Sequence, residues 1–244
     1  MTASEFSNAV FNAPVERCRR LNSIILQHVD PTKPMSVLDI GCGTGAQIFS
    51  LASELPLAQF IGVDISVPSI RIARNALAGS NYADRIAFHN SDYLDFEPES
   101  QMNLILTYST LQFIPVDNAR LFGKIASELV PGGIFINAMA IDCVYNSALT
   151  ILRRAFRVFR GRVTDQMIYS VARLMHGTQI PSEELRERVS YMYEIPQHYD
   201  GRKLQRFLEE RCDLESVEKL SETHANPVQM KHGIHVYRKR KDHA

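Results

Sequence analysis

A loop of alternating glycines follows an apolar segment that contains an acid. Residues 36–40 include Asp39 and run into Gly41, Gly43 and Gly45, after which a helical pattern begins. Glycine permits the positive φ angles of a tight turn and leaves the backbone open to close approach by a ligand. The first turn of the new helix offers free N–H groups. We expect this loop to form the floor of a nucleotide site, outside the carboxyl ends of the strands.

Further polar residues end the next two apolar segments. Asp64 follows the glycine loop by about twenty residues, the spacing at which a carboxylate accepts hydrogen bonds from both ribose hydroxyls. The third segment runs into Asp92 and Tyr93. We expect Asp92 to accept a hydrogen bond from an adenine amino group, and Ile65 and Tyr93 to sandwich the base.

A nicotinamide-dependent oxidoreductase is an alternative that the glycines alone leave open. Gly41, Gly43 and Ala46 satisfy a lax Gly-x-Gly-x-x-Ala fingerprint, which is a weak signal by itself. Tyr199 and Lys203 have the spacing of a Tyr-x-x-x-Lys pair, but Gly201 disfavours the helix that would place both side chains on one face. A binding module without catalytic activity is the other open alternative.

The order of these segments resembles the class I S-adenosylmethionine-dependent methyltransferases, over roughly residues 35–140. The resemblance implies S-adenosylmethionine as the cofactor and methyl transfer to an N, O or C atom of a small-molecule metabolite. It implies that Asp64 binds the ribose, that Asp92, Tyr93 and Ile65 line the adenine pocket, and that residues 108–112 face the sulfonium. The residues implied around the methionine part are Asp39, Gly41, Cys42, Gly43 and Gly45.

Two positions depart from common patterns of that family. Asn103 stands before the fourth strand, where many relatives carry an acid. The sequence Thr107-Tyr108-Ser109-Thr110 stands where one subgroup has Asn/Asp-Pro-Pro-Tyr/Phe, which disfavours methylation of base or amide nitrogens. We therefore expect a small-molecule acceptor, and an RNA acceptor is the less favoured alternative.

The elements that must position these residues alternate regularly. Apolar segments at 36–40, 60–63, 86–89, 104–107 and 134–140 predict strands, and the patterns at 67–78 and 117–130 predict helices between them. We expect Gly79 to end its helix in a left-handed conformation. Alternation predicts right-handed crossovers and a doubly wound parallel sheet. An amphipathic helix at 14–29, a helix at 201–211 and strands at 214–220 and 233–240 complete the pattern.

The predicted fold is therefore α/β, Rossmann-like, in a single domain over residues 1–244. The family resemblance implies a seven-stranded sheet whose last strand is antiparallel. Residues 142–195 interrupt the alternation with helical patterns, and we expect them to form a helical lid over an acceptor pocket.

A basic amphipathic helix is expected within this insertion, at residues 149–160. Its arginines, Arg153, Arg157 and Arg160, share one stripe, and its apolar residues share another. The arginines form either a solvated face or a contact with negative charge on an acceptor, an acidic carrier protein or a membrane surface.

Candidates for contact with the acceptor are few. Tyr108, His198 and Tyr199 are catalytic candidates, and Gln112, Arg153, Arg157 and His176 are candidates for acceptor binding. The aromatic stretch 191–193 forms either an acceptor wall or part of the core. We expect the histidines at 224, 232 and 235 to be ordinary surface residues and no metal to be bound, because a metal needs three or four convergent ligands.

Composition narrows the class of partner and compartment. The chain of 244 residues has 27 basic and 27 acidic residues, so it has no net charge to attract a nucleic acid. Its four cysteines are scattered, which favours a reducing compartment. No apolar segment reaches the length of a membrane span, and no leader pattern is present at the start, so we expect a cytoplasmic protein. No feature of the sequence predicts an oligomeric state.

Overall fold

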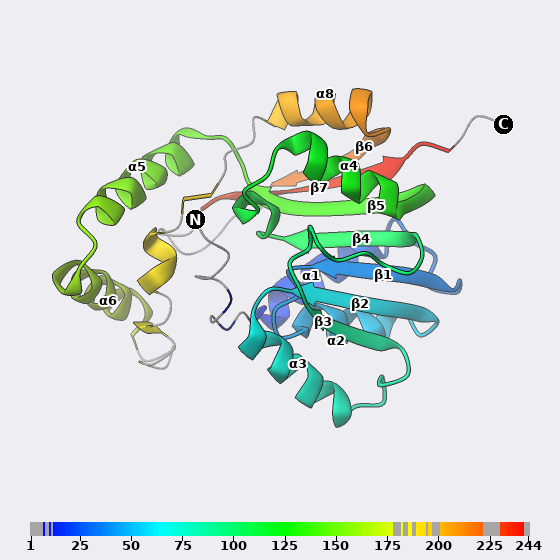
Figure 1. The fold of residues 1–244 in the computed structure, drawn as a ribbon, viewed down its shortest axis with the longest axis horizontal. Helices are drawn as coiled ribbons and strands as arrows, with labels where there is room; N and C mark the ends of the chain where they lie inside the picture. The colour runs from blue at the N-terminus through cyan, green and yellow to red at the C-terminus, as the bar shows by residue number, and fades with distance from the viewer. Residues whose placement is uncertain are drawn as a thin grey trace.

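A computed structural model describes residues 7, 10, 12–177, 182, 185–186, 189–193, 195–196, 201–221 and 230–241. Its strands are β1 (Met35–Ile40), β2 (Ala58–Asp64), β3 (Ile86–Asn90), β4 (Met102–Tyr108), β5 (Leu129–Ala140), β6 (Leu214–Ser221) and β7 (His232–Lys239). They form one sheet in the order β3-β2-β1-β4-β5-β7-β6 (Figure 1). β1 to β5 are parallel, and β7 is antiparallel to both β5 and β6. The predicted seven-stranded sheet with an antiparallel last strand is confirmed.

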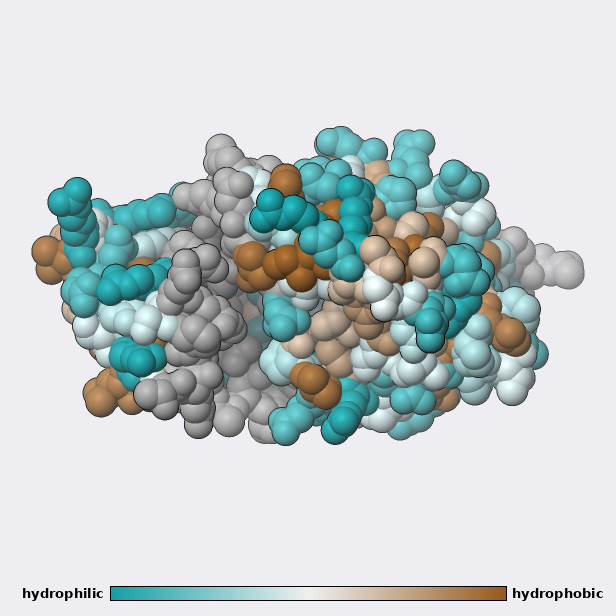
Figure 2. Space-filling view, turned by 90° about the horizontal axis from the view of Figure 1, so that it is seen from below, coloured by the Kyte–Doolittle hydropathy of each residue, from teal (hydrophilic) through white to brown (hydrophobic). Residues whose placement is uncertain are grey.

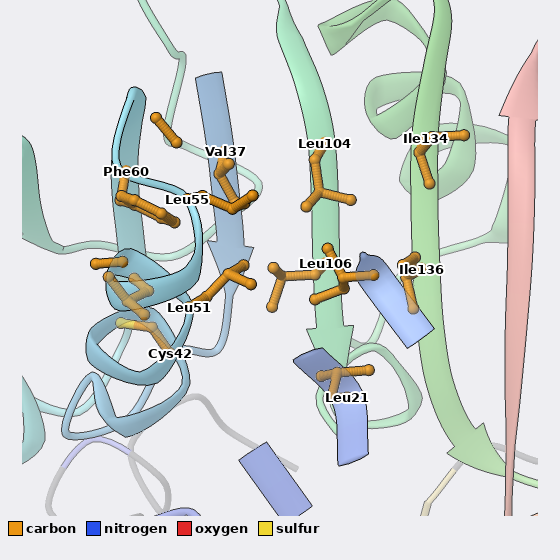
Figure 3. Close-up of a cluster of buried hydrophobic side chains, with 14 of the residues drawn as sticks. Leu21, Val37, Cys42, Leu51, Leu55, Phe60, Leu104, Leu106, Ile134 and Ile136 are labelled. Atoms are coloured by element: carbon orange, nitrogen blue, oxygen red, sulfur yellow. The ribbon is translucent and has the colours of Figure 1, made fainter. Parts of the chain in front are cut away.

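Helices cover both faces of the sheet. The described helices of the core are α1 (Val15–Ile25), α2 (Ala46–Glu54), α3 (Val67–Ala78), α4 (Asn118–Glu128) and α8 (Gly201–Arg211), and a short 3-10 helix, η1 (Leu111–Phe113), follows β4. Successive residues of a strand point to opposite faces. Val37 accordingly packs with α1, α2 and α3, and Leu38 packs with α4 and α8. Figure 3 shows the first of these two apolar clusters, between α1, α2 and strands β1, β2, β4 and β5.

Local chemistry explains where these elements begin and end. Ser66 caps α3 by accepting a hydrogen bond from the backbone N–H of Ser69 at 3.2 Å, and Asp117 caps α4 in the same way. The expected left-handed glycine at the end of α3 is wrong, because Gly79 has φ −94°. Ser80 ends the helix by donating both its backbone N–H and its hydroxyl to the carbonyl of Leu77, so no left-handed residue is needed.

The described part of the insertion after β5 is helical, as the sequence indicated. It contains α5 (Val144–Val158), α6 (Arg162–His176) and a 3-10 helix, η2 (Val189–Tyr193). Figure 1 shows α5 and α6 beyond the carboxyl ends of the parallel strands, apart from the layers that cover the sheet. Within the described part of the chain, no helix combines the length and apolar character needed to cross a membrane.

Candidate functional site

A cavity of about 530 Å³ lies at the carboxyl ends of β1, β2 and β4. β1 has β2 on one side and β4 on the other, so the chain changes direction across the sheet at this point. Open α/β sheets bind ligands at such switch points. The glycine loop and Asp64 form part of the cavity wall, and residues from α1, the β4–η1 turn, α5 and the start of β7 complete it.

The glycine loop has the conformation that its residue types predict. Gly41, Gly43 and Gly45 have φ angles of 77°, 55° and 81°, which favour glycine. A Cβ on Gly41 would lie 2.1 Å from Oγ1 of Thr110. The loop and the β4–η1 turn can therefore pack closely only because residue 41 has no side chain. Gly41 and Gly43 line the cavity. Gly45 instead begins α2, where a Cβ would lie 2.5 Å from the ring of Phe88.

Asp64 is held rigidly by the loop it faces. One carboxylate oxygen accepts the backbone N–H of Gly43 and the other accepts that of Ser66, each at 2.8 Å. Burial raises the pKa of this carboxyl, and the two backbone donors oppose that shift. Both oxygens of the carboxylate have second lone pairs, so Asp64 can still accept from a ligand that enters the cavity.

Asp39 gives the cavity a second buried carboxyl. It is 4% exposed, and burial, followed by the negative charge of Asp64, raises its pKa to about 7. The charge of Arg17 opposes this shift. Two buried carboxyl groups therefore share one wall, which favours a ligand that carries positive charge there. The neighbouring thiol of Cys42 also lines the cavity, and burial raises its pKa well above the ordinary value, so it stays protonated.

The third group of predicted residues lies on the same wall, with one difference. Ile65 and Asp92 line the cavity and are partly exposed. Tyr93 also lines it but is only 4% exposed, because its ring packs in the core and its hydroxyl donates to Glu128 at 2.6 Å. Little of the ring is exposed to the cavity, and the sandwich of a base between Ile65 and Tyr93 stays a prediction.

Tyr108 packs against a guanidinium and an imidazole in the cavity wall. The guanidinium carbon of Arg17 lies 4.1 Å from the centre of its ring, and the ring of His232 stacks against it at 5.8 Å. Arg17 comes from α1, whose buried residues Cys18, Leu21 and Ile25 fix the helix against the sheet. All three side chains line the cavity.

A chain of hydrogen bonds links Ser109 to His232. The Met230 carbonyl accepts from Nδ1 of His232 at 2.8 Å, which leaves Nε2 of the neutral imidazole as the acceptor for the Ser109 hydroxyl at 2.9 Å. Gln112 donates to the same hydroxyl at 3.1 Å and accepts the backbone N–H of Ala140 at 2.8 Å. The Gln112 amide, expected to bind the acceptor, is thus engaged in orienting Ser109.

The arginines of the insertion do not form the single stripe that was expected. Arg153 lines the cavity, whereas Arg157 is exposed and lies outside the lining. Arg160 follows the end of α5, where its guanidinium lies 4.9 Å from the ring of Tyr193. Tyr193 itself is buried against Ile168, which places this member of the aromatic stretch in a local core.

Several candidates from the sequence fall elsewhere. His198 and Tyr199 lie outside the described residues, as does the side chain of His176, and His224 does too. His232 and His235 were expected at the surface, which is wrong: His232 is 4% exposed, and burial lowers the pKa of His235 to about 4. No cluster of three or more metal-ligating side chains occurs in the described part of the chain.

Sequence reasoning missed Arg17 and His232 in the cavity wall. Arg17 lies on a helix that the sequence placed before the site, and His232 begins the last strand. Neither has a local motif, because each reaches the cavity through the packing of an element distant in sequence. Ser109, which has a positive φ of 58°, falls within the stretch 108–112 that was expected to face the sulfonium.

The family model described as a methyltransferase domain matches residues 31–210. The chain belongs to this family, and its fold is that of the class I S-adenosylmethionine-dependent methyltransferases. A solved structure of magnesium protoporphyrin IX methyltransferase from Synechocystis PCC 6803, with bound SAH, is similar at a TM-score of 0.63 and 13% identity, over 92% of this chain and 82% of that one. The N-methyltransferase NodS from Bradyrhizobium japonicum WM9 is similar at 0.55 and 15% identity, over 91% and 86%.

Curated relatives match over shorter stretches. Trans-aconitate 2-methyltransferase of Methylobacterium nodulans is 32% identical over 109 residues, which are 45% of this chain and 40% of that protein. The tRNA1(Val) (adenine(37)-N6)-methyltransferase of Vibrio campbellii is 40% identical over 70 residues, 29% of each chain. The chain thus spans less than half the length of these curated relatives.

Proposed function

We propose that this protein transfers a methyl group from S-adenosylmethionine to a small-molecule acceptor that carries a carboxylate. The observation that carries the proposal is a single cavity that is lined by two buried acids and by two arginines. Asp39 and Asp64 lie beside the glycine loop, and Arg17 and Arg153 line the same cavity. When bound, S-adenosylmethionine supplies an electrophilic methyl group on a positively charged sulfur.

The buried acids fit the donor. Asp39 lies near Asp64, whose negative charge adds to the effect of burial in raising the pKa of Asp39, and the methionine part carries an ammonium and a sulfonium group that can offset this negative charge. Asp64 is oriented by Gly43 and Ser66 and has lone pairs for the two ribose hydroxyls. Gly41 leaves the backbone bare where the ligand enters. Ile65 and Asp92 remain to contact the adenine.

The two arginines of the cavity wall fit an acidic acceptor. Arg153 is partly buried in α5 and lines the cavity, and Arg17 approaches it from α1. A guanidinium binds a carboxylate through two parallel hydrogen bonds, which fixes both position and orientation. The likeness to trans-aconitate 2-methyltransferases supports an acceptor of this class, because aconitate is a carboxylic acid.

Ser109 and His232 are the candidate proton acceptors for an acceptor atom that must lose a proton. The Ser109 hydroxyl takes the proton as it passes its own to Nε2 of His232, so charge balances at the imidazolium. The carbonyl of Met230 keeps the ring in the required orientation. Rate enhancement otherwise comes from holding donor and acceptor in contact, which in model reactions corresponds to effective molarities on the order of 10⁵–10⁸ M. We propose that α5 and α6 act as the lid that excludes water.

The first experiment measures transfer of label from S-adenosylmethionine to a panel of small carboxylic acids that includes trans-aconitate. We expect a labelled product with at least one acid. Arg153→Gln should raise the KM for that acid about tenfold or more, as expected for loss of a charge-assisted pair. Arg157→Gln is the matched control on the same helix and should leave the KM unchanged.

Binding of S-adenosylhomocysteine by calorimetry separates the alternatives. Tight binding without turnover of any acid would favour the non-catalytic binding module. Equal KM values for Arg153→Gln and Arg157→Gln would remove the carboxylate contact. Labelled RNA, in place of a labelled acid, would favour the function of the tRNA relative, whose likeness is limited to 29% of either chain.

A further inference from the structure

The exposed face of α5 is aliphatic. Val144, Ile151 and Val158 are spaced by seven residues, which places them on one stripe of the helix. Their exposed fractions are 88%, 67% and 78%, and the exposed alanines at 148 and 155 fill the intervals. An ordinary amphipathic helix turns such a stripe toward the core. Here the stripe faces away from it.

This stripe is not a wall of the acceptor cavity. Arg153 lines the cavity from the opposite side of α5, about 140–180° around the helix from the three stripe residues at 100° per residue. Leu149 on the inner side is buried, and Phe156 packs against the local core that includes Ile168. α5 therefore presents one face to the cavity and another, apolar face to the outside.

α6 carries a second stripe of the same kind. Val163 and Leu174 are 85% and 86% exposed, and Met167 between them is 48% exposed. Figure 2 shows hydrophobic residues at the surface of the end of the molecule that Figure 1 assigns to α5 and α6. Proteins seldom leave an apolar surface of this extent open unless it contacts a partner or a membrane. We refer to the two stripes together as the α5–α6 surface.

The charge of the same segment identifies the kind of partner. Residues 143–164 contain five arginines and no acid or lysine, although the whole chain is neutral. Arg154, Arg157 and Arg162 are exposed. Aliphatic residues flanked by exposed arginines are typical of helices that lie in the interface of an anionic bilayer. A second copy of the chain fits poorly, because a symmetric contact would bring the two sets of arginines together.

We propose that the α5–α6 surface binds anionic membranes, with both helices lying along the interface, their aliphatic stripes in the acyl boundary and their arginines among the headgroups. This proposal is independent of the acceptor. It predicts that affinity depends on both apolar area and charge, and that salt weakens binding by screening the arginines.

Co-sedimentation with vesicles tests the proposal. We expect the protein to bind phosphatidylcholine vesicles that contain phosphatidylglycerol, and to bind pure phosphatidylcholine vesicles at least tenfold more weakly. The triple variant Val144→Gln, Ile151→Gln, Val158→Gln should lose tenfold or more of the affinity. The matched control is Leu57→Gln with Ile72→Gln, which removes aliphatic residues that are 50% and 42% exposed elsewhere.

Circular dichroism melting of each variant checks that the fold is kept. We expect an unchanged fold, because the substituted side chains are exposed. Failure of the wild type to bind anionic vesicles would overturn the proposal, as would equal binding by the triple variant or equal binding to both kinds of vesicle. Sedimentation velocity provides an independent outcome. A dimer that the triple variant dissociates would assign the surface to a second copy of the chain and also overturn the proposal.

Discussion

Replacement of Asp39 by asparagine should stabilise the protein at neutral and alkaline pH. The carboxyl has a pKa raised to about 7 in the folded protein, against 3.8 as its ordinary value. The folded state therefore binds more protons than the unfolded state between these two pH values, so the free energy of unfolding falls as the pH rises through this window. Above pH 7 the folded protein bears the full free-energy cost of ionising Asp39.

The magnitude follows from that difference. At about 1.36 kcal/mol per pKa unit, the cost of ionising Asp39 in the folded protein is on the order of 4 kcal/mol. Asparagine has nearly the same volume as aspartate and no charge, so Asp39→Asn should raise the free energy of unfolding by an amount of this order at pH 8. At pH 4 the carboxyl is protonated in the folded wild type, and the two proteins should differ little.

Urea unfolding followed by circular dichroism at a series of pH values measures this difference. Glu54→Gln, which neutralises an exposed carboxylate, is the control and should give no comparable gain. Calorimetry should show that Asp39→Asn binds S-adenosylhomocysteine more weakly than the wild type, because the variant lacks the negative charge that we propose to face the ammonium group. An unfolding free energy that is unchanged at pH 8, or a gain that persists undiminished at pH 4, would refute the electrostatic account of this wall.

Two further predictions concern the loop and the proton acceptor. Gly41→Ala should lower the melting temperature and the affinity for S-adenosylhomocysteine, since a left-handed alanine costs about 1–2 kcal/mol and its Cβ would meet Thr110. Adding Thr110→Gly should recover only the part of the loss that comes from this steric clash. Unchanged affinity in the single variant would contradict the assignment of the glycine loop to cofactor binding. His232→Gln should reduce kcat by about 10²–10⁴-fold, with unchanged binding of S-adenosylhomocysteine. Equal kcat values in the two proteins would show that the Ser109–His232 pair only supports the β4–η1 turn.

The grouping of Asp39, Asp64 and the glycine loop was predictable, because these residues lie at or just after strand ends. Asp39 and Asp64 lie at the carboxyl ends of adjacent parallel strands, and the register pairs Ile40 with Val63. Parallel strands place their carboxyl ends at the same edge of the sheet, regardless of the loops that follow them. The glycine loop also requires positive φ angles, and its three glycines indicate that requirement directly.

The surroundings of the Tyr108 ring were not predictable in the same way. Arg17 and His232 are separated by more than two hundred residues, and only the docking of α1 and the position of β7 beside β5 bring both to the ring of Tyr108. The hydrogen bonds of Gln112 were not predictable for a related reason, because one partner, the backbone of Ala140, lies at the end of β5, 28 residues further along the chain. Periodicity reports which face of an element is apolar, not which distant polar group will meet it.

The position of β7 has a consequence for synthesis of the chain. β7 is the last strand in sequence, but it lies between β5 and β6, and β6 pairs with no other strand in the described structure. Until residues 232–239 have left the ribosome, β5 presents an open edge whose N–H and C=O groups can pair with another nascent chain. Parallel strands β1 to β5 can assemble during translation, yet the sheet closes only after its final strand is released, which makes chaperone access to the β5 edge a determinant of yield.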